Sequence, residues 1–116
     1  MNAIAWILQI ILALLFLGAG GTKLTQSKDK LRPMMGWVDD YSDRGVKLIA
    51  GLEVLGAIGL ILPWATGIAK VLTPLAALGL AIIMAGAVWT HAKRKEPWIP
   101  QLVLLILTLV VAIVRF

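Results

Sequence analysis

Four long apolar runs, joined by short polar connections, restrict the fold of this sequence more than any other feature. They predict membrane spans over about residues 2–24, 43–62, 66–92 and 98–114. A helix rises about 1.5 Å per residue, so roughly 20 apolar residues cross a hydrocarbon core of about 30 Å. A soluble chain of 116 residues with 60% hydrophobic residues could not bury that much apolar surface. We therefore predict an all-α fold, a polytopic four-transmembrane-helix bundle forming one domain over residues 1–116, with both termini on the same side.

The connections between the runs predict how the spans begin and end. Residues 25–42 mix charged with apolar side chains, which is typical of a segment lying on the membrane surface. Pro63 predicts the end of the second span, and Pro74 is expected near the first turn of the third. Residues 1–5 contain no basic residue, so we interpret the first run as a retained membrane helix rather than a signal peptide.

The distribution of basic residues predicts the orientation in the membrane. One side carries Lys23, Lys28, Lys30, Arg32, Arg44, Lys47, Lys93, Arg94 and Lys95, and the other side carries only Lys70 and Arg115. Because positive charge is retained on the cytoplasmic side, loops 25–42 and 93–97 are expected in the cytoplasm and both termini outside. The charges lie in these connections and do not form a nucleic-acid footprint, so the expected environment is the lipid bilayer, with no nucleic acid.

Glu53 is the most informative single residue, because it lies within the apolar second run. A charged side chain at such a depth costs several kcal/mol unless it is paired, hydrated or protonated, and it marks a functional site by default. We consider a ligand-binding carboxylate, a proton-transfer group and a partner of Lys23. The structural alternative is a carboxyl that is buried neutral or paired only to fix the register of the helices.

Further polar side chains are expected near the cytoplasmic ends of the other spans. Lys23 ends the first span, Thr90 and His91 end the third, and Gln101 begins the fourth. Together with Glu53 they form the predicted ligand-binding or proton site. Gln9 and Gln101 are each more readily interpreted as interhelical hydrogen-bond groups than as ligands. Lys23 could instead extend its ammonium to the headgroups, and His91, close to the basic residues 93–95, could simply be interfacial.

Several kinds of chemistry are excluded or disfavoured by the residues present. The chain has no cysteine, so it contains no disulfide, no CxxC pair and no thiolate metal site. One histidine with one nearby acid makes a poor metal site, and we predict none. No nucleotide-binding loop and no serine nucleophile beside a histidine is present, so no catalytic residue is assigned.

Several stretches resemble the DoxX-like family of small membrane proteins. FLGAGGTKL (16–24) is similar to the end of that family's first helix, and MGWVDDYS (35–42) resembles its first loop. LIAGLEVLGAIGLILP (48–63) resembles its second helix with a single acid, and LTPLAA (72–77) with Thr90-His91 resembles the third. The likeness covers nearly the whole chain, and its motifs gain specificity in combination.

The resemblance implies a compact four-helix bundle in a bacterial inner membrane, in which Lys23, Glu53 and His91 are the polar family positions. Some relatives are subunits of a thiosulfate–quinone oxidoreductase and others are associated with membrane redox complexes, so quinone is the candidate cofactor. The chain has no cysteine and therefore lacks the thiol that a thiol-based version of that role would require.

Three functions follow as expectations. The first is an accessory protein whose pocket around Glu53 binds a lipid-like or quinone-like molecule, or the helix of a partner. The second is a quinone-linked redox subunit in which Glu53 or His91 manages the proton. The third is a small proton-coupled transporter that acts as a homo-oligomer, because four short helices enclose little volume.

Overall fold

A computed structural model describes residues 2–31, 33, 36 and 41–116 of the chain. Within these residues the chain forms helices only: α1 (Asn2–Thr25), α2 (Lys28–Leu31), α3 (Asp43–Thr66), α4 (Leu72–Lys93) and α5 (Ile99–Arg115). Helices α1, α3 and α4 are long and apolar enough to cross a membrane, whereas α5 has 17 residues and is shorter. The all-helical, membrane-type fold is confirmed. Part of the predicted surface segment 25–42, namely residues 32, 34–35 and 37–40, lies outside the described residues.

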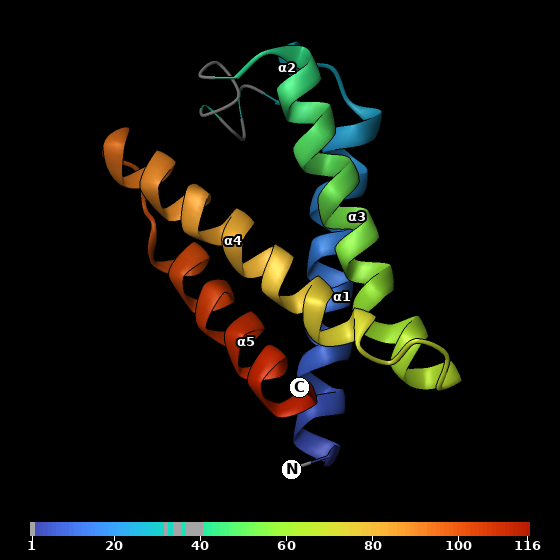
Figure 1. Cartoon of the computed structure of the whole chain (residues 1–116). Helices are drawn as coiled ribbons and strands as arrows, with labels where there is room; N and C mark the ends of the chain where they lie inside the picture. Colours follow the sequence, from blue (N-terminus) through green and yellow to red (C-terminus); the bar gives the residue numbers. More distant parts are fainter. Residues whose placement is uncertain (1, 32, 34–35, 37–40) are drawn as a thin grey trace.

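The helices pack as two antiparallel pairs. Helix α1 lies along α3, α4 lies along α5, and α4 also packs against α3 (Figure 1). The two pairs converge near the chain ends and diverge toward the end that carries α2 (Figure 1). Arg115 Nη1 donates to Asn2 Oδ1 at 2.9 Å, which ties the last helix to the first at the convergent end.

The apolar side chains divide into an inner core and an outer, lipid-type surface. Leu12, Phe16, Leu60, Leu80 and Val111 are fully buried between the helices. Many other leucine and isoleucine side chains are exposed around the outside. A soluble protein rarely exposes apolar area so continuously, so the surrounding solvent is the hydrocarbon of a bilayer.

Helix α3 continues through Pro63, which corrects the prediction that this proline ends the helix at residue 62. A proline has no backbone N–H, so the carbonyl of Gly59, four residues earlier, loses its usual partner. In the structure the Thr73 hydroxyl of α4 donates to that carbonyl at 2.8 Å. The helix therefore tolerates Pro63 because a neighbouring helix supplies the missing hydrogen bond.

The turn between α3 and α4 also shifts the predicted start of the third span, from residue 66 to Leu72. Gly67 adopts φ 73°, and its N–H donates to the Pro63 carbonyl, which closes α3 with a left-handed residue. Ala69 also has a positive φ of 50°. These two residues reverse the chain, and Pro74 then falls in the first turn of α4, where its missing N–H costs little.

Glycines set how closely α3 is approached by its neighbours. A Cβ at Gly56 would lie 2.7 Å from Leu80, and one at Gly59 would lie 2.7 Å from the Ala76 Cβ, so both glycines admit α4. On the other face, a Cβ at Gly20 of α1 would lie 2.9 Å from the Ala50 carbonyl oxygen. The close approach of α1 to α3 beside the predicted site thus depends on Gly20, and the close approach of α4 to α3 depends on Gly56.

Candidate functional site

An ion pair between α1 and α3 lies at the centre of the site. Lys23 Nζ is 2.6 Å from Glu53 Oε1, and the two residues are only 8% and 1% exposed. Helix α1 approaches α3 closely here because Gly20, one turn before Lys23, would place a Cβ only 3.1 Å from the Glu53 Cβ. Lys23 therefore turns inward to the acid instead of extending to the headgroups.

Lys47 fixes the turn from which Lys23 projects. Its ammonium donates to the carbonyl oxygens of Lys23, Leu24 and Gln26 at 2.6, 3.0 and 2.6 Å. These are carbonyls of the last turn of α1 and the residue after it, which have few helical partners of their own. A cation at the C-terminus of a helix also interacts favourably with the helix dipole. Lys47 is thus fully engaged as a cap of α1, and it holds the backbone beside the ion pair.

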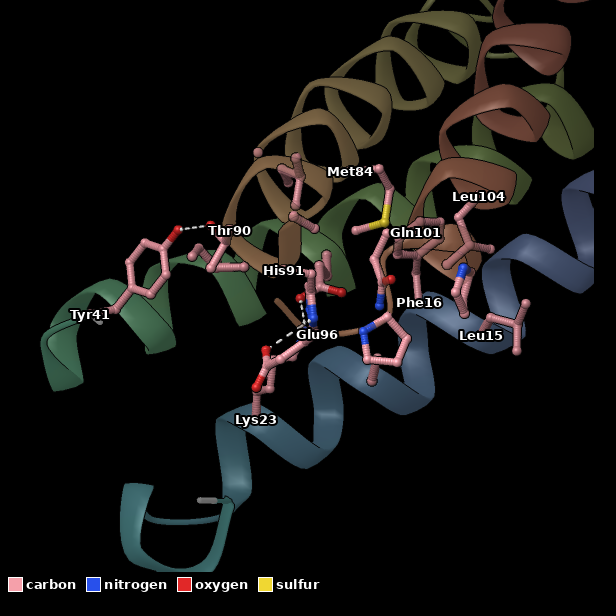
Figure 2. A pocket seen from close by; sticks show the side chains of 18 of the residues that line it. Leu15, Phe16, Lys23, Tyr41, Met84, Thr90, His91, Glu96, Gln101 and Leu104 are labelled. Atoms are coloured by element: carbon pink, nitrogen blue, oxygen red, sulfur yellow. Dashed lines mark hydrogen bonds and ion pairs between the residues drawn. The ribbon is translucent and has the colours of Figure 1, made fainter. Parts of the chain in front are cut away.

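The end of α4 contributes a second polar group. The Thr90 hydroxyl and the Tyr41 hydroxyl lie 2.8 Å apart in a hydrogen bond that joins α4 to the segment before α3 (Figure 2). His91 Nδ1 lies 3.3 Å from Glu96 Oε1, and Arg94 Nε lies 3.4 Å from Glu96 Oε2. Glu96 therefore bridges two basic side chains at the turn between α4 and α5.

These groups surround a cavity of about 650 Å³ between the two helix pairs. All five residues that the sequence predicts for the site line it, and they come from four helices: Lys23, Glu53, Thr90, His91 and Gln101. In Figure 2 the polar side chains of Tyr41, Thr90, His91 and Glu96 gather toward one part of the cavity, with Leu15, Met84 and Leu104 toward the other. The cavity is amphipathic, with a charged part and an oily part.

Gln101 stands where these two parts meet. Gln101 lines the cavity together with Phe16 and Leu104 (Figure 2), and its Oε1 is buried without a hydrogen-bond partner among the described residues. A buried polar atom without a partner costs free energy, roughly 1–3 kcal/mol, so native structures rarely retain one without a reason. An amide oriented into a cavity in this way is suited to a ligand that donates a hydrogen bond.

Gln9 lies apart from the cavity, as expected for an interhelical hydrogen-bond group. Its Nε2 donates to the Leu60 carbonyl at 2.6 Å, and its Oε1 accepts from Arg115 Nε at 2.8 Å. One side chain thus links α1 to both α3 and α5.

Sequence reasoning missed four residues that shape the site or the bundle. Tyr41 and Glu96 line the cavity, Lys47 caps α1, and Arg115 joins α5 to α1. Glu96 carried a usable signal, because it is the only acidic residue in the basic connection that follows His91. Tyr41 carried none, since its contact with Thr90 joins residues 49 positions apart.

The described residues contain no group of three or more His, Cys, Asp or Glu side chains that could hold a metal ion. The charged part of the cavity is instead made of ion pairs and hydroxyl groups, which suit the polar head of an organic molecule.

A comparison with protein families matches residues 7–114 to the DoxX-like family. The chain belongs to the DoxX-like family. In this DoxX-like chain the match includes every described residue that lines the cavity. Searches of curated proteins and of solved structures each found no match.

Proposed function

We propose that this DoxX-like protein is an accessory membrane protein that binds an amphiphilic small molecule, quinone-like or lipid-like, in the cavity beside Glu53. The observation that carries the proposal is the buried Gln101 Oε1, which has no hydrogen-bond partner among the described residues and lies where the charged and oily parts of a cavity of about 650 Å³ meet. Cavities of about 300–1,000 Å³ with a few polar groups among apolar walls are the usual size for organic ligands.

The lining supports one orientation of the ligand. The polar head lies against Gln101 and the Lys23–Glu53 pair, and the apolar part lies along Phe16, Met84 and the leucines of α1 and α5. A primary amide offers both a hydrogen-bond donor and an acceptor, so Gln101 can pair with a carbonyl or with a hydroxyl of the head. A quinone and its quinol present these two groups, which is why a quinone fits at least as well as a lipid.

The helix of a partner is a weaker occupant of the same cavity. A transmembrane helix is about 10 Å across and satisfies its own backbone hydrogen bonds, so it offers few groups for a buried amide and an ion pair.

One observation favours a quinone-linked redox subunit as the second candidate. The His91–Glu96 pair and the Lys23–Glu53 pair line the same cavity, and reduction of a quinone takes up protons as well as electrons. In that role this chain would hold the quinone near protonatable groups, and a partner redox protein would supply the electrons. A proton-coupled transporter would use Glu53 as its coupling site.

We further propose that α5 crosses the membrane with the other three long helices, in a bacterial inner membrane. The pairing of Asn2 with Arg115 supports placing both ends of the bundle on one side. Together with the positive-inside rule, it favours cytoplasmic loops 25–42 and 93–97 and outside termini.

The test is to purify the protein in mild detergent with its bound molecules, extract them and identify them by mass spectrometry. We expect a co-purified amphiphile near one equivalent per chain in the wild type, and at least a fivefold loss in Gln101→Leu. Gln26→Leu makes the same chemical change outside the cavity lining and is the matched control.

Three results decide between the candidates. A quinone that is lost in Gln101→Leu and retained in Gln26→Leu supports the proposal, and its reduction by a partner complex would favour the redox subunit. Proton-driven uptake in proteoliposomes that is abolished by Glu53→Gln would favour the transporter. Equal amounts of every extracted molecule in the wild type and in Gln101→Leu would overturn the binding role.

A further inference from the structure

Arg115, at the convergent end of the bundle, is a buried cation with only neutral hydrogen-bond partners among the described residues. The residue is 9% exposed; Nε donates to Gln9 Oε1 at 2.8 Å and Nη1 to Asn2 Oδ1 at 2.9 Å. Its Nη2 is buried and has no hydrogen-bond partner in the part of the chain that the structure describes. The guanidinium thus keeps one unused hydrogen-bonding nitrogen, and the hydrogen-bond partners of its other two nitrogens among the described residues carry no negative charge.

Two tryptophans lie beside this guanidinium, and one of them also contacts a second cation. Its Cζ lies 4.3 Å from the centre of the Trp64 ring and 5.7 Å from that of Trp6. The Lys70 ammonium lies 5.0 Å from the same Trp64 ring. The reversing turn with positive φ at Gly67 and Ala69 brings Lys70 back over the end of α3. Two positive charges therefore share one aromatic ring.

No acidic residue accompanies these cations. The sequence contains no Asp or Glu in residues 1–28, 54–95 or 97–116, which include every segment at this end of the bundle. The ion pairs among the described residues involve Lys23, His91 and Arg94, and neither Arg115 nor Lys70. Cation–π contacts and neutral amides offset part of the cost of a buried charge, and an anion would offset the rest.

The surroundings indicate which anion fits. Tryptophan, arginine and lysine at the end of a membrane helix lie at the level of the headgroups, where lipid phosphate is the most abundant anion. A guanidinium binds phosphate through parallel N–H groups, and an ammonium adds a point charge. Exposed Ile68 and Phe116 give this end an apolar flank that suits an acyl chain.

We propose that Arg115, Lys70, Trp64 and Trp6 form a binding site for the phosphate of an anionic phospholipid headgroup. The site lies at the opposite end of the bundle from the charged part of the cavity and does not depend on the proposed ligand of that cavity. A free phosphate ion shares the same chemistry without the acyl chains, so the test compares the two sources.

The experiment measures binding to the delipidated full chain by native mass spectrometry, with phosphatidylglycerol, phosphatidylcholine or inorganic phosphate added. We expect the wild type to bind phosphatidylglycerol at least tenfold more tightly than phosphatidylcholine, and inorganic phosphate only weakly. Arg115→Gln/Lys70→Gln should lose that preference. Lys30→Gln/Lys95→Gln removes two exposed lysines from the other end of the bundle and should keep it.

A second variant separates a loss of binding from a loss of fold. Lys70→Gln alone changes an exposed residue in a turn, so the bundle should remain intact while the preference for phosphatidylglycerol falls severalfold. Equal binding of the two lipids to the wild type would overturn the proposal, as would an unchanged preference in Arg115→Gln/Lys70→Gln. Inorganic phosphate that binds as tightly as phosphatidylglycerol would overturn the lipid assignment and indicate a free-anion site.

Discussion

Glu53 differs from the acidic residues in the connections because it lies in mid-helix and its partner comes from a different helix. The 2.6 Å contact with Lys23 pairs two opposite charges that are both largely buried. In such surroundings the mutual attraction is strong, and so is the cost of leaving one charge alone. The pair therefore couples the position of α1 to that of α3 as well as forming one wall of the cavity.

The ion pair predicts a strongly non-additive double-mutant cycle. Lys23→Met should lower the free energy of unfolding by about 3–5 kcal/mol, because it leaves the buried Glu53 carboxylate without its ammonium. The double variant Lys23→Met/Glu53→Gln removes both charges and should recover most of that loss. Thermal unfolding in detergent, followed by tryptophan fluorescence, measures both effects. Lys30→Met, at an exposed lysine, is the control, and costs that simply add would show that the pair is not coupled.

At the scale of the helices, the path and packing of α3 depend on residues of the neighbouring helices. The carbonyl freed by Pro63 is satisfied from α4, and the close contact with α1 requires a glycine on α1. Each of these two contacts can be tested by a change of one or two atoms.

Thr73→Val keeps the shape of the side chain and removes the hydroxyl that reaches the Gly59 carbonyl. We expect it to lower the free energy of unfolding by about 1–3 kcal/mol, because a buried carbonyl loses its partner. Pro63→Ala restores the helical N–H, so Thr73→Val should cost much less in that background. The same cost in both backgrounds would argue against this explanation of how α3 continues through Pro63, and Thr73→Ser should behave as the wild type.

Gly20 and Gly18 offer a matched pair on α1. Gly20→Ala places a methyl group 2.9 Å from both the Ala50 carbonyl oxygen and the Val54 Cγ2, so α1 must move away from α3. We expect a loss of about 1–3 kcal/mol in unfolding free energy, from overpacking. A Cβ at Gly18 meets nothing within 4 Å, so Gly18→Ala should leave stability unchanged or raise it by up to about 1 kcal/mol. Equal effects at the two positions would contradict the close packing at Gly20.

The helices were easier to predict from the sequence than their ends. Long apolar runs report helices directly, and the polar residue Ser42 accepts from the Gly45 N–H as the cap at the start of α3. The predicted end of α3 was wrong because the carbonyl that Pro63 leaves without a partner is satisfied by Thr73, which lies on the next helix. A local pattern does not contain a hydrogen bond that depends on how two helices pack.

At the scale of the whole molecule, the site is a product of how the two helix pairs diverge. Lys23, Glu53, Thr90, His91 and Gln101 were each visible as polar residues in apolar surroundings, and depth along the helices indicated that they share one end of the bundle. The sequence left open whether Lys23 turns inward, because that depends on the approach that Gly20 permits. It also gave no measure of the cavity, which arises from the angle between the pairs (Figure 1).

The arrangement of the molecule in the membrane gives the last prediction. Helix α5 has 17 residues, about 25 Å at 1.5 Å per residue, which is just short of a typical hydrocarbon core. A bilayer can thin locally around a short helix at modest cost, so we expect α5 to cross.

The chain has no cysteine, so each single-cysteine variant reports one position. In intact cells a membrane-impermeant maleimide should label Ile68→Cys and Phe116→Cys, and should label Ser27→Cys and Lys95→Cys only after permeabilisation. The cysteine-free chain is the control. The inverse pattern would reverse the orientation, and Phe116→Cys behaving as Lys95→Cys does would mean that α5 stays on one side of the membrane.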